Sequence, residues 1–137
     1  MQGLIQIEGI TLARVIPNIM NIKDSGANFF SDSKDFLQVG QIYYPKGHNI
    51  PSHEHLEVKN NISFINEVLI LIEGKMEVNL YIKRILKHSL ILNSGDAIVL
   101  MSGGHGFKML EPSKMIEIKQ GPYMGELDKI RFNDPSK

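Results

Sequence analysis

The sequence contains no cysteine among its 137 residues, which excludes disulfide bonds and thiolate metal sites. It carries no net charge, because 15 basic residues balance 15 acidic ones, so no overall field attracts the chain to nucleic acid or to an anionic membrane. Its longest apolar run, Val68 to Ile72, is far shorter than the roughly 18 residues of a membrane span. These absences predict a protein without nucleic-acid or membrane partners.

The N-terminal segment also lacks the features of a signal peptide. Its first basic side chain is Arg14, so it has neither the charged start nor the apolar run that such a peptide needs. Because the chain has no cysteine either, we expect a cytoplasmic protein.

Hydrophobic residues make up 42% of the chain, which fits one globular domain with a single core. Short apolar runs alternate with turn signals about every 8–12 residues, a pattern that predicts an all-β sandwich or barrel. We expect one domain over residues 1–137, with an N-terminal strand segment at 1–35, a barrel core at 36–119 and a C-terminal tail at 120–137. Only residues 16–36 could readily hold a helix.

Apolar and β-branched runs locate the expected strands. The first 16 residues indicate one or two strands, and residues 21–35 indicate a polar loop. Residues 67–82 predict two strands around a turn at Glu73-Gly74-Lys75. Further strands are expected at 36–45, 53–55, 97–100, 107–110 and 115–118.

Four side chains are candidates for one metal site: His53, His55, Glu67 and His105. Because strand side chains alternate, His53 and His55 would point to one face, about 7 Å apart. Glu67 begins an apolar strand, where an unpaired charge is costly, and a metal ion would offset that cost. His105 follows two glycines, which let the backbone turn sharply and direct one side chain inward.

Each of these residues also has a simpler explanation. Two histidines separated by one residue usually lie at the surface without a specific role. Glu67 could pair with Lys75 or cap a turn. His105 could be a loop histidine held by its neighbours. The joint arrangement favours a metal site over these separate explanations. His48 and His88 lack such a setting and are expected at the surface.

The first segment resembles the first motif of the cupin superfamily. That motif is a glycine, five residues, His-x-His, a spacer, a glutamate, six residues and a glycine. This chain has the same order and the same five-residue and six-residue gaps. The matching residues are Gly47, His53, His55, Glu67 and Gly74. The spacer departs from the family, because the eleven residues between His55 and Glu67 exceed its usual length.

The second segment resembles the second cupin motif, which is a glycine, five residues, Pro-x-Gly, two residues and a histidine. Gly95 opens it and His105 closes it. Met101 stands in place of the proline, and His105 comes one residue early. The resemblance covers roughly residues 36–119, and its specificity lies in the two motifs together.

The resemblance implies a double-stranded β-helix, or jelly-roll barrel, that holds one divalent metal ion near an open end. Imidazole and carboxylate ligands suit Zn, Fe, Mn, Ni or Cu, among which the sequence does not choose. The resemblance also implies a homodimer, with the apolar N-terminal strand paired on the partner's sheet. The segment from Ile116 to Tyr123 is similar to small single-domain cupins encoded among bacterial surface-sugar genes.

An ion with four protein ligands keeps an open coordination position, so the expected function is metal-dependent action on a small polar molecule. The first hypothesis is an isomerase or epimerase of a sugar derivative. The alternatives are an iron-dependent dioxygenase and a non-catalytic sugar-binding or sensing barrel. Phe107 and Met109 share the parity of His105 and are expected to line the barrel interior. Candidate substrate groups, each with a simpler role at the surface or in packing, are Tyr43, Lys108, Glu117, Lys119 and Tyr123.

Residues 56–66, the long spacer of the first motif, are expected to form a flexible lid over the metal site. The middle of the segment, residues 59–61, is polar, while its ends must reach the site. A plain hairpin extension is the alternative. The side chains expected to pack across the barrel mouth are Leu56, Val58, Ile62, Phe64 and Ile65.

Overall fold

A computed structural model describes residues 3–21, 24–57, 59, 61–121 and 124–134. The described chain is all-β, with ten strands and one short 3-10 helix, η1 (Gly125–Leu127), which confirms the predicted class. The strands form three antiparallel sheets and not a closed barrel. None of the helical structure in the described residues is long and apolar enough to cross a membrane.

The chain divides into two compact units. Unit 1 contains Met1–Ile19 and Phe64–Lys137, and unit 2 contains Met20–Ser63. The border between residues 63 and 64 falls inside the range that the sequence predicts as barrel core. Each unit is described by itself below.

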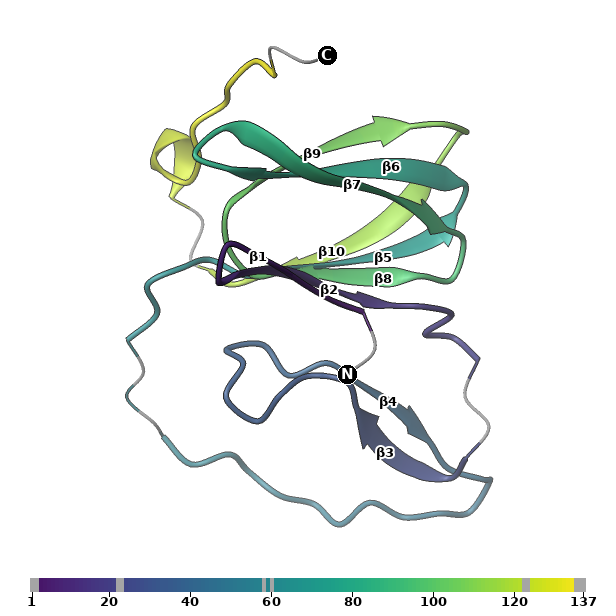
Figure 1. The fold of residues 1–137 in the computed structure, drawn as a ribbon. Coiled ribbons are helices and arrows are strands. Elements are labelled where there is room, and N and C mark those ends of the chain that lie inside the picture. Colours follow the sequence, from purple (N-terminus) through teal and green to yellow (C-terminus); the bar gives the residue numbers. More distant parts are fainter. Residues whose placement is uncertain (1–2, 22–23, 58, 60, 122–123, 135–137) are drawn as a thin grey trace. The chain divides into compact units, whose positions relative to one another are not determined.

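The larger sheet of unit 1 has five strands and contains the N-terminal hairpin (Figure 1). Strand β2 pairs with β1 on one side and with β8 on the other. Strand β2 therefore has a pairing edge within its own chain, and the expected pairing of the N-terminal strand with a partner's sheet stays a prediction. The strand order is β1 (Leu4–Ile7), β2 (Ile10–Ile16), β8 (Ala97–Leu100), β5 (Glu67–Glu73) and β10 (Lys114–Lys119).

The second sheet of unit 1 forms a separate layer, in which β6 is the central strand (Figure 1). Strands β5, β8 and β10 lie in the five-stranded layer, and β6, β7 and β9 lie in the second layer. The chain therefore crosses between the layers at every connection from β5 to β10 except the β6–β7 hairpin. Residues far apart in the sequence therefore meet across the layers. The strand order is β7 (Ile85–Asn93), β6 (Lys75–Ile82) and β9 (Gly104–Met109).

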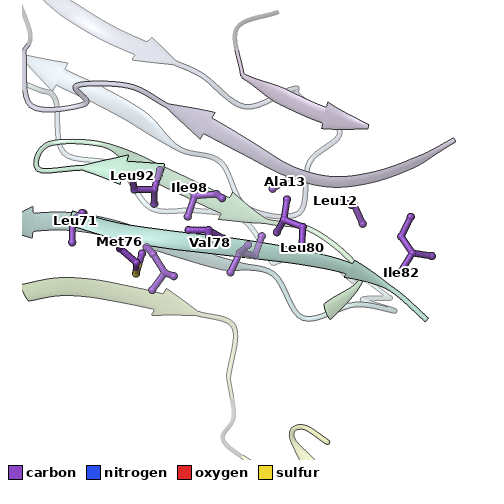
Figure 2. Packing of buried hydrophobic residues seen from close by; sticks show 11 residues of the cluster. Leu12, Ala13, Leu71, Met76, Val78, Leu80, Ile82, Leu92 and Ile98 are labelled. Atoms are coloured by element: carbon purple, nitrogen blue, oxygen red, sulfur yellow. The ribbon is translucent and has the colours of Figure 1, made fainter. Parts of the chain in front are cut away.

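The hydrophobic core lies between these two layers. Alternate residues of β6, namely Met76, Val78 and Leu80, are almost fully buried, as the side-chain period of a strand requires. Figure 2 shows them beside side chains of the five-stranded sheet, including Leu71 and Ile98. Burying each such side chain stabilises the fold by about 1.5–3 kcal/mol, so this core holds the two layers in register.

Two glycines shape the turns that lead into β6 and β9. Gly74 joins β5 to β6 with φ +102°, and a Cβ there would lie 2.4 Å from the carbonyl oxygen of Pro112. Gly103 precedes β9 with φ +74°, and a Cβ there would lie 2.5 Å from the carbonyl oxygen of Tyr81. Both positions therefore need glycine for conformation and for space.

The described residues of unit 2 form one hairpin, with strands β3 (Gly26–Phe29) and β4 (Gly40–Tyr43). Strand β3 lies inside the range predicted as a loop, and the described residues of 16–36 form no helix. The prediction of a strand at residues 53–55 is wrong, because these residues have no regular structure. A strand needs a hydrogen-bonded neighbour, and within the described part of unit 2 the two strands pair with each other.

Candidate functional site

Glu67, the first residue of β5, lies at one end of the five-stranded sheet. It is aligned with Leu100 of β8 and Lys119 of β10. Glu67 shares its parity with the core residue Leu69, so its side chain lies on the inner face of the sheet. The preceding residue, Asn66, is buried and anchors this strand end. Its backbone N–H donates to Gln120 Oε1 at 2.9 Å.

His105 lies near the start of β9, in the opposite layer. It is aligned with the core residue Leu80 of β6, so the two side chains share the inner face. The loop before it is tied to β2, because Ser102 Oγ donates to the carbonyl oxygen of Thr11 at 2.6 Å. This tie and the Gly103 turn confirm the expectation that the glycine-rich loop delivers His105 inward.

The two side chains meet between the layers. Nε2 of His105 lies 3.1 Å from Oε2 of Glu67, and their side chains are 31% and 13% exposed. The contact joins strands from different sheets whose positions are set by the core. The structure therefore brings together two of the four predicted ligands.

Electrostatic effects favour the neutral form of His105. Burial lowers the pKa of its imidazole below the ordinary value, and the positive charge of Lys129 lowers it further. The charges of Glu67 and Glu117 and the Glu67 hydrogen bond oppose this shift without reversing it. Metal ions bind the neutral imidazole, and an ion at Nε2 would take the place of the proton that Nε2 donates to Glu67.

The separation of Glu67 and His105 is that of two ligands of one divalent ion, but the described residues contain no group of three or more His, Asp or Glu side chains that could hold an ion. Two donors at about 2.1 Å from one ion, with an angle of about 90–110°, lie about 3.0–3.4 Å apart. The 3.1 Å separation of Nε2 and Oε2 lies within that range. An imidazole nitrogen and a carboxylate oxygen are also the donors that zinc and its neighbours in the first transition series accept.

The other predicted ligands, His53 and His55, form a second pair within unit 2. Their rings make an edge contact, with centroids 5.4 Å apart and planes at 73°, and both residues are exposed. Nδ1 of His53 donates to the carbonyl oxygen of Pro51 at 2.9 Å, because a carbonyl can only accept. This bond leaves Nε2 of His53 with its lone pair. Since the two pairs lie in different units, the prediction that all four side chains hold one ion stays a prediction.

A cavity of about 810 Å³ opens beside the Glu67–His105 pair. Its size is within the roughly 300–1,000 Å³ of typical small-molecule sites. Its walls are the start of β5, the start of β9 and a C-terminal segment. The lining residues are Ile65, Glu67, Tyr81, Gly103 to Phe107 and Asp128 to Asn133.

The C-terminal segment, residues 128–134, is a wall of the cavity that the sequence analysis missed. Figure 1 shows it in yellow beyond η1. Asp128 Oδ2 accepts from Lys119 Nζ at 3.1 Å at one end, and Asp134 Oδ2 accepts from the Tyr81 hydroxyl at 2.7 Å at the other. Between them, the Phe132 ring packs edge-on against Tyr81, with centroids 5.1 Å apart. In the sequence, the signal for this wall is the aromatic residue Phe132 between the acidic residues Asp128 and Asp134.

The Tyr81 hydroxyl is held in its protonated form. Burial, followed by the hydrogen bond and the charge of Asp134 and the charge of Glu77, raises its pKa to about 12. Tyr81 therefore fastens the C-terminal segment and does not release its proton near neutral pH.

The remaining predicted residues have varied positions. Phe107 lines the cavity, with its ring centroid 5.3 Å from that of His105, while Met109 at the other end of β9 is exposed. His48, which stacks on Tyr44 with centroids 3.7 Å apart, and His88 are exposed as predicted. Of the candidate substrate groups, Lys119 binds Asp128, Tyr123 lies outside the described residues, and the exposed ones are Tyr43, Lys108 and Glu117.

The predicted lid at residues 56–66 spans the border between the units. Ile65 belongs to unit 1 and lines the cavity, whereas Leu56 is exposed in unit 2. Val58 and Asn60 lie outside the described residues. The lid therefore stays a prediction.

Comparison of the chain with models of known protein families, with curated proteins and with solved structures finds no match.

Proposed function

We propose that this protein binds one divalent metal ion at Glu67 and His105 and holds a small polar molecule in the adjoining cavity. The observation that carries the proposal is the 3.1 Å approach of a carboxylate and an imidazole from two different sheets, at the wall of a cavity. The side chain of Glu67 is only 13% exposed, and a metal ion would help to offset the cost of burying its charge. The neutral imidazole favoured by burial is a ligand and not a counter-ion.

We also infer that the two sheets of unit 1 belong to a jelly roll of the cupin kind. The alternation of β5 to β10 between the layers supports this inference, because a jelly roll winds its strands between two sheets. The glycines of the two resembling motifs support it as well. Gly74 lies in the turn that ends β5, the strand of Glu67, and Gly95 lies in the turn between β7 and β8, with φ at +102° and +91°.

The sequence predicts that His53 and His55 complete the ligand set. The hydrogen bond from His53 Nδ1 to Pro51 leaves Nε2 available, as a metal-binding histidine requires. A divalent ion bound there would supply Lewis acidity and an open position for an oxygen ligand. The ion is Zn, Fe, Mn, Ni or Cu in this proposal, because the donor set suits each of them.

Ligand binding is better supported than any one reaction. A proton-transfer residue has to be able to exchange its proton near neutral pH. Tyr81 holds its proton up to about pH 12, and Asp128 is paired with Lys119. Isomerisation or epimerisation of a sugar derivative extends the proposal, with an iron-dependent dioxygenase or a non-catalytic sugar-binding barrel as the alternatives.

The proposal is tested by metal titration of chelator-treated protein. Calorimetry with zinc and with manganese should give one ion per chain for the wild type. Glu67→Gln and His105→Gln should each weaken that binding at least about 100-fold, because each removes one donor from the pair. The matched controls are Glu73→Gln, at the exposed far end of the same strand, and His88→Gln on β7. Unchanged binding in both site variants would refute the proposal.

A further inference from the structure

Strand β9 is an edge strand of the second sheet, and among the described strands it pairs with β6 alone. The N–H of Leu110, the residue that follows β9, donates to the carbonyl oxygen of Lys75 at 2.9 Å. The register of β6 and β9 places these two residues opposite each other. They are therefore a hydrogen-bonded pair, and such pairs alternate along an antiparallel ladder.

This alternation sets the direction of each backbone group in β9. Counted back from Leu110, Gly104 and Gly106 are in hydrogen-bonded positions, so their N–H and C=O groups face β6. The N–H and C=O groups of His105 and Phe107 face the open edge instead. Within the described residues, these open-edge groups form no hydrogen bond. The edge therefore offers two donors and two acceptors to a ligand.

The cavity borders this open edge. Successive side chains of a strand point to opposite faces, so Gly104 and Gly106 lie on the face opposite to that of His105 and Phe107. All four residues line the cavity. A cavity that reaches both faces of a strand passes round one of its edges, and the other edge of β9 is covered by β6.

Gly106 leaves room at this edge that the fold does not use. Its φ is not positive, and an added Cβ would meet only the Tyr81 ring, at an ordinary distance of 3.8 Å. Gly104 differs, because a Cβ there would lie 3.1 Å from the Phe132 ring. Glycine weakens a strand interior and often marks the close approach of a ligand or of another backbone. Gly106 is explained by such an approach.

The cavity wall opposite β9 carries positive charge. Lys129 and Arg131 line the cavity and are exposed, and no acidic side chain in the described part of the chain forms an ion pair with either of them. The acidic lining residues are engaged elsewhere, since Glu67 contacts His105 and Asp128 binds Lys119. A ligand with carboxylate groups complements this wall.

We propose that the cavity binds an acidic peptide in extended conformation, which pairs with the open edge of β9 as an added strand. In an extended peptide, the N–H and C=O of one residue lie on the same side and match those of His105, and the next match comes two residues later, about 7 Å away, at Phe107. This inference rests on the cavity of the proposed function and names its ligand class, but it does not depend on the metal ion.

The experiment uses an acetylated and amidated tetrapeptide of alternating valine and glutamate. One comparison peptide is methylated at every backbone nitrogen, and in another lysine replaces glutamate. The acidic peptide should bind at least about tenfold more tightly than either, because methylation removes two hydrogen bonds and lysine reverses the charge. Calorimetry measures the affinities. Amide hydrogen exchange should slow at His105 and Phe107 when the acidic peptide binds.

Variants separate the backbone contacts from the charge. Phe107→Pro removes one open-edge N–H, and proline is tolerated where that group faces away from the sheet. It should bind the acidic peptide about fivefold more weakly than Phe107→Ala, which loses the same ring but keeps the N–H. Met109→Pro is the matched control, because Met109 has the same direction on β9 but does not line the cavity.

Lys129→Gln/Arg131→Gln should remove the preference for glutamate over lysine and keep the preference for the unmethylated peptide. Lys75→Gln/Lys114→Gln is the charge-matched control. Lys75 begins β6, whose other end carries Tyr81, and Lys114 lies opposite Glu73 at the far end of β5. This control should behave like the wild type.

The outcomes distinguish this inference from the metal proposal when chelator-treated and metal-loaded protein are both measured. Equal affinities for the acidic peptide and its methylated form would overturn the peptide proposal even where one metal ion binds. Peptide binding without metal binding would overturn the metal proposal alone. Protection of His105 and Phe107 by self-association without peptide would assign the edge to a second copy of the chain. The two peptides decide the question on the wild type even if Phe107→Pro fails to fold.

Discussion

The Glu67–His105 pair of unit 1 and the His53–His55 pair of unit 2 use the same kinds of donor on different kinds of backbone. The first pair lies on two strands whose registers are set by hydrogen bonds and by a buried core. The second lies on an irregular segment and is exposed. Pairs built on rigid elements keep their geometry without a ligand, whereas an exposed segment loses conformational freedom when it binds.

The comparison shows that the chemical type of the donor side chains and their positioning by the fold are separate properties. Sequence spacing identifies both pairs as candidate donors, but only the unit 1 pair has its separation determined by the fold around it. We therefore expect substitutions in unit 1 to change stability, metal affinity and proton binding more than equivalent substitutions in unit 2. The predictions below test that contrast, starting with the largest expected effect.

The largest effect is expected from the core between the layers. Leu71 is completely buried, so Leu71→Ala should lower the free energy of unfolding by about 3 kcal/mol through lost burial and a cavity. Ile42 of unit 2 is 57% exposed, and Ile42→Ala should change it by less than about 0.5 kcal/mol. Urea unfolding measures both. Equal losses would show that the two regions are not different in packing.

The next largest effect concerns metal affinity. Loss of a group that merely supports a ligand weakens binding about 10–100-fold, so loss of a ligand should cost at least about 100-fold. Glu67→Gln and His105→Gln should reach this value. His53→Ala/His55→Ala should also weaken binding, because the sequence predicts that these side chains complete the site.

Competition titration with a chelating dye measures these affinities. A double histidine variant that binds as tightly as the wild type would restrict the site to unit 1 and refute the four-ligand prediction. His48→Ala, a change at another exposed histidine of unit 2, is the control.

A smaller effect is expected at Tyr81, where the pKa is raised to about 12. A group with a raised pKa favours the folded state while it is protonated. This contribution is complete below about pH 10, the ordinary pKa of tyrosine, and is lost as the pH rises toward about 12. Asp134→Asn should lower the pKa without restoring the ordinary value, because burial is the largest cause and remains.

Carbon NMR of the Tyr81 ring, assigned with Tyr81→Phe, follows this titration. Asp24→Asn, at an exposed position of unit 2, should leave the Tyr81 pKa unchanged. A Tyr81 pKa near 10 in the wild type would mean that the C-terminal segment does not pack on Tyr81.

The smallest effect is expected at the exposed end of unit 1. Lys114 and Glu73 form an ion pair of 2.8 Å with side chains 78% and 62% exposed. Their coupling energy in a double-mutant cycle with Lys114→Gln and Glu73→Gln should be below about 1 kcal/mol, because solvent screens such pairs. A larger value would mean that substitutions at Lys114 and Glu73 change stability themselves and cannot serve as controls.

Local patterns predicted the parts of the fold that depend on local chemistry. The apolar alternation around Gly74 predicted β5, the turn and β6, because strand parity and positive φ are properties of a few adjacent residues. The glycines before His105 predicted its inward direction, and Gly103 has the positive φ of a sharp turn. The all-β class followed from many such short runs.

Features that depend on distant partners were not predictable in this way. Residues 53–55 have the alternation of a strand, but a strand also needs a neighbour, and sequence alternation does not supply one. The packing of Phe132 and Asp134 on Tyr81 joins positions more than 50 residues apart. For this reason the cavity wall at residues 128–134 was found only in the structure.

The most direct test of the account is the anomalous difference density of a crystal soaked with zinc. The account predicts one strong peak between the carboxylate of Glu67 and Nε2 of His105, with bonds of about 2.0–2.2 Å to both donors. A peak held by His53 and His55 without Glu67 and His105, or full occupancy at other residues with this pair empty, would contradict it.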